Sequence, residues 1–548
     1  MMTGVEERAE LSPTGWGRAD SAHELSNAAR KWLRREIGWI PRATPSEELA
    51  SVTTAATRLP DSSSAALIAI VGADNVCTDG PSRLRRGSGR SYLDLIRRRG
   101  GDVSGLPDAV VLPGSHDEVL AILGRCVDDD VAVIPFGGGT SVVGGLAGGA
   151  GEHRAVIAVD LARLNSIGAI DAKSLLVTAG PGLRAPEFES RMARYGLTLG
   201  HFPQSYEFAT LGGYAATRSA GQASTGYGRF DELVAGAQLA TPVGSWKVGR
   251  PPASAAGPDL LGLVLGSEGS FGVITELTLR VRPTPEAKHY EGWSFRSLTR
   301  AIEGLRQLAR AGLLPDIVRL SDSAETRANL VLAGGSKAAA LQALLRARGH
   351  GTGCVLILGW EGDHDTVGVR RRAAGALLRR CEAVRLGRSV GHGWLSNRYS
   401  GPYVRDALLD VGLLVETLET AATWSDLMDV YDAARVALSD SLSTADKKPL
   451  VMCHVSHVYS TGASLYFTVV ADRDDDRPLQ QWLLAKRAAT DALLSRGGGL
   501  THHHAVGIDH APWLSQEIGG LGIAVLHAVK DQLDPTGICN PCVLFGHP

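Results

Sequence analysis

Three adjacent histidines, His502, His503 and His504, stand in the segment GGLTHHHAVG near the end of the chain. Imidazole titrates near neutral pH and can stabilise a reactive anion, so the run favours a catalytic cluster. A polar turn and a metal site are the other two interpretations. Because neighbours on a chain point in different directions, we expect no single metal ion to bind all three, and we predict no metal.

A glycine-rich stretch, PFGGGTSVVGG, runs from Pro135 to Gly145 directly after a predicted buried strand at 131–136. Consecutive glycines let backbone N–H groups turn toward an anion, as a pyrophosphate requires. A simple tight turn is the alternative. The spacing fits neither GxGxxG nor a Walker A sequence, so it predicts no Rossmann site and no P-loop.

Two later segments support an anion site of this kind. The first, PQSYEFATLGGYAATRSAGQASTGYGRFDELV at 203–234, combines small residues and hydroxyls at a density that an ordinary core would not select. The second, GPDLLGLVLGSEGSFGVITELTLRVRPTP at 257–285, places glycines beside Ser267, Glu268 and Ser270 before a predicted strand.

The pattern of apolar residues predicts the helices and strands that position these segments. Ser115 and Glu118 predict a capping box at the start of a helix that ends near 128–130. Before it, the first 75 residues read as helical, with a hinge or extended connection near Pro60 and the serines that follow. Further strands and helices are predicted from the apolar runs: strands at 156–160, 175–179, 272–281, 354–358 and 465–470, and helices at 297–312 and 364–382.

The bulk composition describes an ordinary globular chain of two to four domains, with 548 residues, 44 % hydrophobic and 21 % charged. A net charge of -2 argues against a nucleic-acid binder. Two arginine-rich clusters, at 83–99 and 370–380, favour solvated helix faces over phosphate or anionic-lipid contacts. Seven cysteines without regular spacing fit a reducing compartment, and Cys539 and Cys542 are interpreted as structural.

Targeting signals are not expected. The acidic N-terminus, with Glu6, Glu7 and Glu10, resembles no signal peptide, and no stretch is long and apolar enough for a membrane-spanning helix. We therefore expect a cytoplasmic protein, with peripheral membrane contact as an open option.

The three glycine-rich segments, in their order and spacing, resemble the FAD-binding domain of the vanillyl-alcohol oxidase superfamily. Over residues 80 to 548 the chain is most similar to the alkylglycerone-phosphate synthase family. The resemblance implies an α+β fold: a PCMH-type two-subdomain FAD-binding domain plus an α/β cap domain with a mainly antiparallel sheet. It implies the division 1–80 (helical segment), 81–285 (FAD-binding domain), 286–500 (substrate-binding cap) and 501–548 (a segment completing the active site).

The resemblance also implies a set of FAD-binding residues. Many superfamily members tether FAD through a histidine in the glycine loop, but here Thr140 follows the glycines, so FAD is expected to be non-covalent. The residues that correspond to the family's cofactor site are Pro135, Phe136, Gly137, Gly138, Gly139, Thr140, Ser141, Val142, Gln204, Ser205, Tyr206, Glu207, Phe208, Ala209, Thr210, Thr217, Arg218, Ser219, Ala220, Glu268, Gly269, Ser270, Phe271, Gly272, Val273 and Ile274.

Catalytic roles come from the same resemblance. The segment CHVSHVYSTGASLYFTVV and the triple histidine look like the synthase signature, and Tyr466 corresponds to the family's catalytic tyrosine, although a buried core tyrosine is the alternative. Arg405 corresponds to a substrate-contacting position and Arg319 to one needed for activity. Guanidinium suits phosphate or carboxylate, and salt bridges, for instance to Asp406 or Asp322, are the alternative.

The implied reaction exchanges the acyl group of acyl-dihydroxyacetone phosphate for a fatty alcohol, without net redox change, with a flavin ring nitrogen as nucleophile. The alternative function is an FAD-dependent oxidoreductase that oxidises a 2-hydroxyacid or related alcohol, and a flavin-binding protein without catalysis is a third class. The expected partners are a lipid-like phosphorylated small molecule and a second copy in a homodimer. Three features depart from the family: the first 80 residues match weakly, the chain ends in GHP without a peroxisomal address, and Cys542 follows the NP where many members have glycine.

Overall fold

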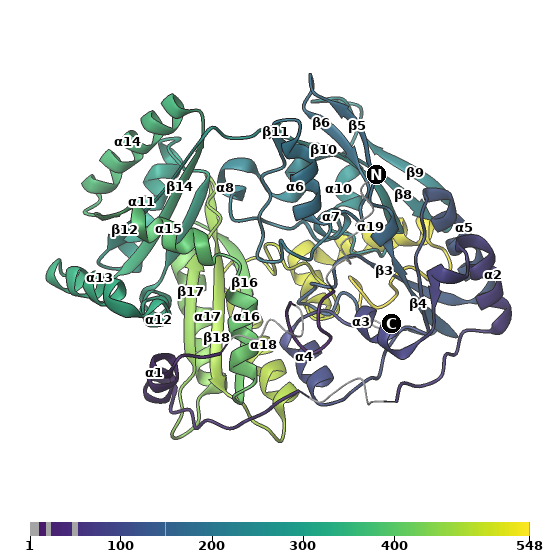
Figure 1. Ribbon diagram of the computed structural model, residues 1–548, viewed down its shortest axis with the longest axis horizontal. Helices are drawn as coiled ribbons and strands as arrows, with labels where there is room; N and C mark the ends of the chain where they lie inside the picture. The colour runs from purple at the N-terminus through teal and green to yellow at the C-terminus, as the bar shows by residue number, and fades with distance from the viewer. Residues whose placement is uncertain (1–9, 18–23, 47–52, 148, 547–548) are drawn as a thin grey trace, which may run out of the picture.

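The computed structural model describes residues 10–17, 24–46, 53–147 and 149–546. Glu6, Glu7 and the terminal His547 and Pro548 of the GHP end lie outside the described residues. Figure 1 shows two halves side by side, one blue and one green, with the yellow C-terminal segment placed against the blue half and toward the green one.

The blue half contains a four-stranded sheet in the order β1-β2-β4-β3. Its central strands are continuous apolar runs, which is typical of parallel strands buried on both faces, and β2 and β3 both pair in parallel with β4. Helices α2 and α5 pack against each other beside it. The elements are α2 (Asp61–Val71), β1 (Val76–Cys77), β2 (Ala109–Val111), α5 (His116–Asp129), β3 (Val131–Phe136) and β4 (Ala155–Asp160).

A second sheet of the same half has the antiparallel order β5-β6-β10-β8-β9. Short helices between its strands carry the segments expected to hold the cofactor. The strands are β5 (Ile167–Asp171), β6 (Leu176–Ala179), β8 (Val234–Thr241), β9 (Gly244–Gly249) and β10 (Val273–Arg280), with β7 (Leu197–Thr198) and β11 (Arg282–Pro283) paired separately. The helices are α6 (Ala185–Ala193), α7 (Leu211–Thr217), α8 (Ser224–Tyr227), α9 (Phe230–Leu233) and α10 (Leu261–Val264).

The green half is a seven-stranded sheet in the order β15-β12-β14-β13-β17-β18-β16, and its paired strands are antiparallel. The strands are β12 (Ala287–Phe295), β13 (Ile317–Ser321), β14 (Cys354–Gly362), β15 (Val384–Gly387), β16 (Leu413–Thr423), β17 (Leu450–Val455) and β18 (Gly462–Asp472). The helices are α11 (Leu298–Arg310), α12 (Ser323–Ala333), α13 (Gly335–Ala347), α14 (His364–Arg380), α15 (Arg388–Asn397), α16 (Gly401–Leu409), α17 (Leu427–Leu442) and α18 (Pro478–Leu494). The expected α+β class with a mainly antiparallel cap sheet is confirmed.

The end of the chain returns to the blue half. After α19 (Leu514–Leu533), the backbone N–H of Val133 donates to the carbonyl of Ile538, and the N–H of Asn540 donates back to the carbonyl of Val133. The last residues therefore extend the four-stranded sheet beside β3, the strand that leads into the glycine loop. Figure 1 shows this yellow segment against β3 and β4.

The extended connection expected near Pro60 is confirmed, because residues 53–60 form no helix or strand and α2 begins at Asp61. Pro60 is the N-cap of α2, and Ser62, Ser63 and Ser64 lie in its first turn, where proline and serine are well tolerated. Helix α1 (Asn27–Ile37) precedes a non-helical stretch that includes the described residues 38–46 and 53–59.

The interpretation of the first arginine cluster as a solvated face is wrong for four of its members. The buried side chains of Arg83, Arg90, Arg98 and Arg99, on or beside α3 (Gly80–Arg86) and α4 (Tyr92–Arg99), donate hydrogen bonds to backbone carbonyls. Each guanidinium satisfies loop carbonyls that would otherwise need water, so these arginines fasten loops together. In the second cluster Arg372, Arg379 and Arg380 are exposed, as expected.

Two other local predictions concern the capping box at the start of α5 and the two C-terminal cysteines. Ser115 accepts the N–H of Glu118 at 3.1 Å, but the Glu118 carboxylate accepts from Gly114 rather than from Ser115, so the capping box is only half formed. Cys539 and Cys542 are free and fully buried, as their structural interpretation requires.

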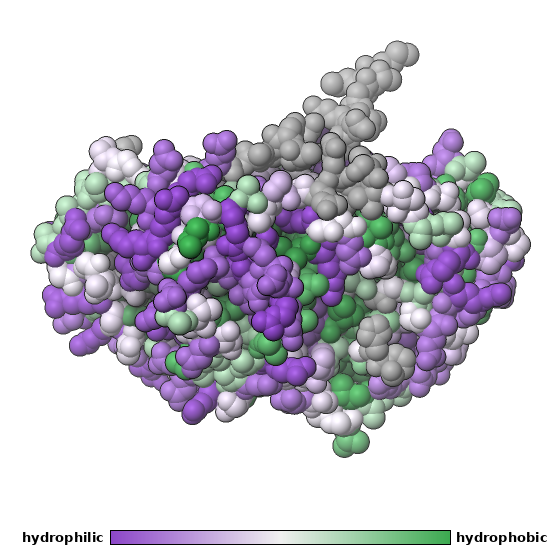
Figure 2. All heavy atoms as spheres, turned by 90° about the horizontal axis from the view of Figure 1, so that it is seen from below, coloured by the Kyte–Doolittle hydropathy of each residue, from purple (hydrophilic) through white to green (hydrophobic). Residues whose placement is uncertain are grey.

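Among the described residues, no helix is both long and apolar enough to cross a bilayer. On the face in Figure 2, hydrophilic residues dominate the left, and hydrophobic ones gather toward the middle.

Candidate active site

The glycine loop follows β3, and three of its backbone N–H groups are unpaired within the described residues. Within the described residues, the N–H groups of Gly138, Gly139 and Thr140 make no hydrogen bond. Gly139 has φ +68°, a left-handed conformation that favours glycine. Successive N–H groups without partners form a concavity suited to an anion, so this loop fits the pyrophosphate of FAD.

The second cofactor segment packs directly on this loop. A Cβ added to Gly138 would lie 2.3 Å from the carbonyl oxygen of Phe208, and one added to Gly137 would lie 2.4 Å from Oγ1 of Thr210. Glycine is therefore needed here for close contact between two protein segments, whereas the sequence alone suggested contact with the cofactor. The amide Nε2 of Gln204 is buried without a partner in the described protein, so it remains able to bind a ligand.

Other expected cofactor residues use their side chains to join segments. Arg218 adopts φ +51° after α7 and donates to the carbonyls of Gly262 and Leu265. Ser219 shares a hydrogen bond of 3.1 Å with His201, whose burial lowers its pKa to about 3. These contacts hold the segment 217–220 in place, together with backbone hydrogen bonds from the Ser219 N–H to the carbonyl of Tyr214 and from the Phe230 N–H to the carbonyl of Ser219.

Glu268 connects the FAD half with the C-terminal segment. Its carboxylate accepts the N–H groups of Val506 at 2.8 Å and Gly507 at 2.9 Å, directly beyond the triple histidine. Burial raises the pKa of Glu268 to about 7, and these two hydrogen bonds act against that shift. Ser270 and Phe271 contact the end of the chain through Val543 and Phe545. The segment 268–274 thus positions the histidines as well as leading into β10.

Tyr466 lies on β18 among imidazole rings. Its ring stacks on His454 at 4.7 Å and on His503 at 5.9 Å, and it meets His504 edge-on at 5.5 Å. Loss of hydration raises the pKa of Tyr466 to about 12, so its hydroxyl is a neutral acid at physiological pH. The structure therefore brings the tyrosine and two of the three expected histidines together.

Arg319 reaches this cluster through two neighbours. Its Nη2 donates to Glu325 at 2.7 Å, while His454 lies 3.1 Å from its Nη1 and shares a hydrogen bond of 3.0 Å with Glu325. Burial alone would raise the pKa of Glu325, but the charge of Arg319 and the contact with His454 hold it far below its ordinary value. Arg319 thus forms its salt bridge with Glu325 rather than with Asp322, and orients the ring that stacks on Tyr466.

The triple histidine is held by one buried carboxylate. Glu419, opposite Tyr466 in the β16–β18 pairing, accepts the backbone N–H groups of His502, His503 and His504 and the hydroxyl of Thr501. Although burial raises its pKa, the neighbouring histidines hold the pKa well below its ordinary value. Burial lowers the pKa of His502 and of His504 to about 3, so both are neutral at pH 7.

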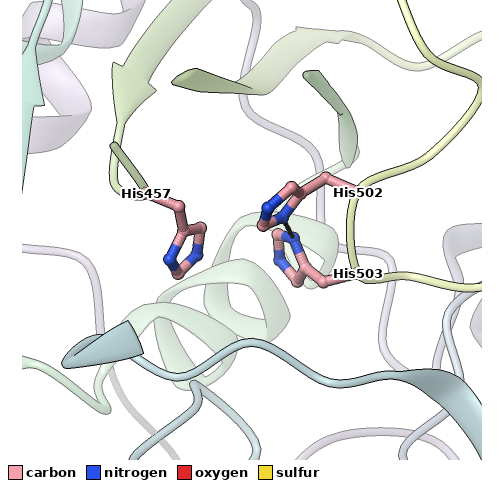
Figure 3. A group of neighbouring side chains, drawn as sticks. All are labelled: His457, His502 and His503. Atoms are coloured by element: carbon pink, nitrogen blue, oxygen red, sulfur yellow. Dashed lines mark hydrogen bonds between the residues drawn. The ribbon is translucent and has the colours of Figure 1, made fainter. Parts of the chain in front are cut away.

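A fourth histidine joins the cluster. His457 follows β17, and its ring lies 4.9 Å from that of His502 and 5.4 Å from that of His503 (Figure 3). One ligand nitrogen from each of these three rings lies within 4.8 Å of the others, a spacing that can accept a metal ion. His504 is not part of this set.

Arg405, on α16, has unused donors. Its Nη1 donates to the carbonyl of Arg90 at 2.7 Å, and Nε lies 3.5 Å from Asp406, but Nε and Nη2 are buried without a hydrogen bond in the described protein. Glu416, on β16, interacts electrostatically with both Arg405 and Tyr466. A buried guanidinium with two unused donors is suited to bind an anion near Tyr466.

Several site residues were not identified from the sequence: Glu325, Glu419, His454, His457 and Tyr459. The segment CHVSHVYS does carry two histidines and a tyrosine before the turn into β18, and that clustering was an available signal. Glu419 lies within the apolar strand β16, and Glu325 lies in the first turn of α12. No local motif marks either residue, and strand pairing brings them to the histidines.

Two family models match the chain. Residues 107–249 match the FAD binding domain, and residues 284–544 match the C-terminal domain of FAD linked oxidases. FAD is therefore the cofactor.

Two relatives and one solved structure that are similar over most of the chain have the same name. The alkyldihydroxyacetonephosphate synthase of Dictyostelium discoideum is 31 % identical over 477 residues, covering 85 % of this chain and 78 % of the relative. That of Trypanosoma brucei brucei is 32 % identical over 492 residues, covering 87 % and 80 %. A solved alkyldihydroxyacetonephosphate synthase structure superimposes with a TM-score of 0.85 at 27 % identity, covering 97 % of this chain and 98 % of that one. The chain belongs to the alkyldihydroxyacetonephosphate synthase family.

Proposed function

We propose that the protein exchanges the fatty acyl group of acyl-dihydroxyacetone phosphate for a fatty alcohol. The bond between the substrate carbon and the carboxylate oxygen breaks, a bond to the alcohol oxygen forms, and the alcohol proton leaves with no net oxidation. Bound FAD supplies a nucleophilic ring nitrogen for this exchange. The observation that carries the proposal is the contact of Tyr466 with His503 and His504 in a chain of this family.

The roles of individual residues follow from their surroundings. Tyr466 donates or accepts the proton at the reacting carbon, and the histidines exchange protons with it; burial raises the pKa of Tyr466 and so strengthens its preference for the protonated form. Arg405 binds the phosphate or the departing carboxylate through its unused donors. Arg319 acts as a positioning residue, because it contacts His454, whose ring stacks on Tyr466.

The cofactor assignment is part of the same proposal. The free N–H groups of the glycine loop and the segments 204–210, 217–220 and 268–274 support it as the FAD site. We also propose the division into 1–80, 81–285, 286–500 and 501–548. A homodimer, a cytoplasmic location and peripheral contact with membranes remain predictions.

The test is an anaerobic exchange assay. Wild type should incorporate labelled fatty acid into acyl-dihydroxyacetone phosphate without an electron acceptor and without bleaching the flavin. Tyr466→Phe keeps the ring but should lose on the order of 10²-fold to 10⁴-fold in rate, the contribution of one positioned acid or base, while retaining FAD. Tyr195→Phe, at an exposed tyrosine, is the matched control and should keep full activity. No exchange by the wild type, together with flavin reduction by a 2-hydroxyacid, would establish the oxidoreductase alternative instead.

A further inference from the structure

A chain of hydrogen bonds leads outward from His503, one of the two histidines that stack on Tyr466. Nδ1 of His503 lies 2.9 Å from Nδ1 of His502, and Nε2 of His502 lies 2.6 Å from the hydroxyl of Tyr459. Figure 3 shows the first of these bonds between the facing rings. Both distances are those of good hydrogen bonds, and each needs one proton between its two atoms.

The chain begins in the interior and ends near solvent. His502 is buried, whereas Tyr459 is partly exposed in the turn between β17 and β18, next to the exposed Ser460. No hydrogen bond within the described residues engages Nε2 of His503, so this nitrogen is available at the inner end.

Two proton arrangements satisfy every bond of the chain without any charged ring. In one, His503 Nδ1 donates to His502 Nδ1, His502 Nε2 donates to the oxygen of Tyr459, and His503 Nε2 is a base. In the other, Tyr459 donates to His502 Nε2, His502 Nδ1 donates to His503 Nδ1, and His503 Nε2 carries a proton. Which tautomer each ring adopts is therefore set by its neighbour.

We propose that Tyr459 and His502 form a proton relay that connects His503, beside Tyr466, with solvent. When His503 Nε2 takes a proton from the reacting group, its Nδ1 proton passes to His502, the Nε2 proton of His502 passes to Tyr459, and the hydroxyl proton of Tyr459 passes to water. One proton enters, one leaves, and the chain ends in the second arrangement. This inference rests on the proposed function, because it assigns a task to the same site.

The surroundings favour transfer without a charged intermediate. The buried rings of His457 and His502 have strongly lowered pKa values, so neither holds a positive charge at neutral pH. Arg229 donates from Nη1 to the carbonyl of His502 at 3.0 Å and disfavours a second cation there. On the other side, a carboxylate oxygen of Glu419 lies 3.4 Å from His503 Nδ1 and favours a proton on that nitrogen, which makes the first arrangement the resting state of the chain.

The experiment uses FAD-loaded protein labelled with ¹⁵N-histidine. In Tyr459→Phe, the bond to His502 Nε2 is lost, so the nitrogen shifts of His502 should report a changed tautomer, while those of the distant Tyr195→Phe control should match the wild type. In the exchange assay, Tyr459→Phe should lower kcat about 10²-fold, at the low end for one positioned acid or base, with KM and FAD content unchanged.

Each outcome decides the proposal. An unchanged His502 tautomer in Tyr459→Phe overturns the hydrogen-bond chain, and a changed tautomer with full kcat overturns its use as a relay. Co²⁺ absorption bands that appear with wild type and vanish in His457→Ala would show that the cluster binds metal, which also overturns the relay because a metal would replace the shared proton. If the wild type lacks exchange activity, the proposed function fails, and the nitrogen shifts still report whether the chain of bonds exists.

Discussion

Removing the charge of Glu419 should loosen the whole histidine loop. The substitution Glu419→Gln keeps the size of the side chain but replaces one acceptor oxygen with an NH₂ group. In the native protein the two oxygens accept four donors: three consecutive backbone N–H groups and the hydroxyl of Thr501. Oε1 accepts from all four donors, whereas Oε2 accepts only from the His502 N–H, so an amide NH₂ in the Oε2 position turns a donor toward that N–H.

The expected cost follows from that opposed donor. A buried donor that loses its acceptor costs about 1 to 3 kcal/mol, so the opposed His502 N–H gives about 1 to 3 kcal/mol of lost stability. The native pKa of Glu419 is lowered, so its charge contributes stability that is fully present above its unfolded pKa of about 4.3 and is lost as pH falls toward the folded value. The difference between variant and wild type should therefore be largest at pH 7 and shrink below about pH 4.3.

Chemical denaturation at pH 7, 5.5 and 4 measures this difference. The matched control is Glu416→Gln, the same change three residues earlier on β16. Burial raises the pKa of Glu416, so the fold disfavours its charge and neutralising it should cost far less. Equal stability of Glu419→Gln and wild type at pH 7, or a loss equal to that of the control, would refute the argument that this carboxylate organises the histidines.

Three further outcomes are expected. Arg405→Ala should raise KM or lower turnover by the equivalent of about 2 to 5 kcal/mol without loss of FAD, because it removes a buried donor set for an anion; if the variant unfolds, Arg405 is only a salt-bridge residue. Gly138→Ala should weaken FAD binding, measured by flavin fluorescence, because its Cβ would lie 2.3 Å from the Phe208 carbonyl, whereas Gly124→Ala on α5, where the Cβ meets nothing within 4 Å, should bind FAD normally. Mild acid should release FAD from the polypeptide, since Thr140 offers no tether; flavin that remains on the precipitated protein would contradict this.

Local patterns in the sequence determined the elements around the site. Apolar runs located β3, β4, β10 and β18, because a strand buried on both faces needs little more than a continuous apolar run. The glycine loop predicted that another group approaches its backbone closely, because only glycine leaves room for such an approach. The motifs also carried the family resemblance, and with it Tyr466 and the histidines.

The tertiary structure decided which of those residues act together. Glu419, His454 and Tyr466 stand on three strands, and only the order β17-β18-β16 brings them side by side. Tertiary structure also decided the role of Arg83 and Arg90, whose positive charge predicted solvent exposure. Both are buried, because the loop carbonyls that accept their hydrogen bonds come from distant parts of the chain. A sequence shows which groups are able to ionise, but burial and partners set their pKa values, and both arise from contacts between residues far apart in the chain.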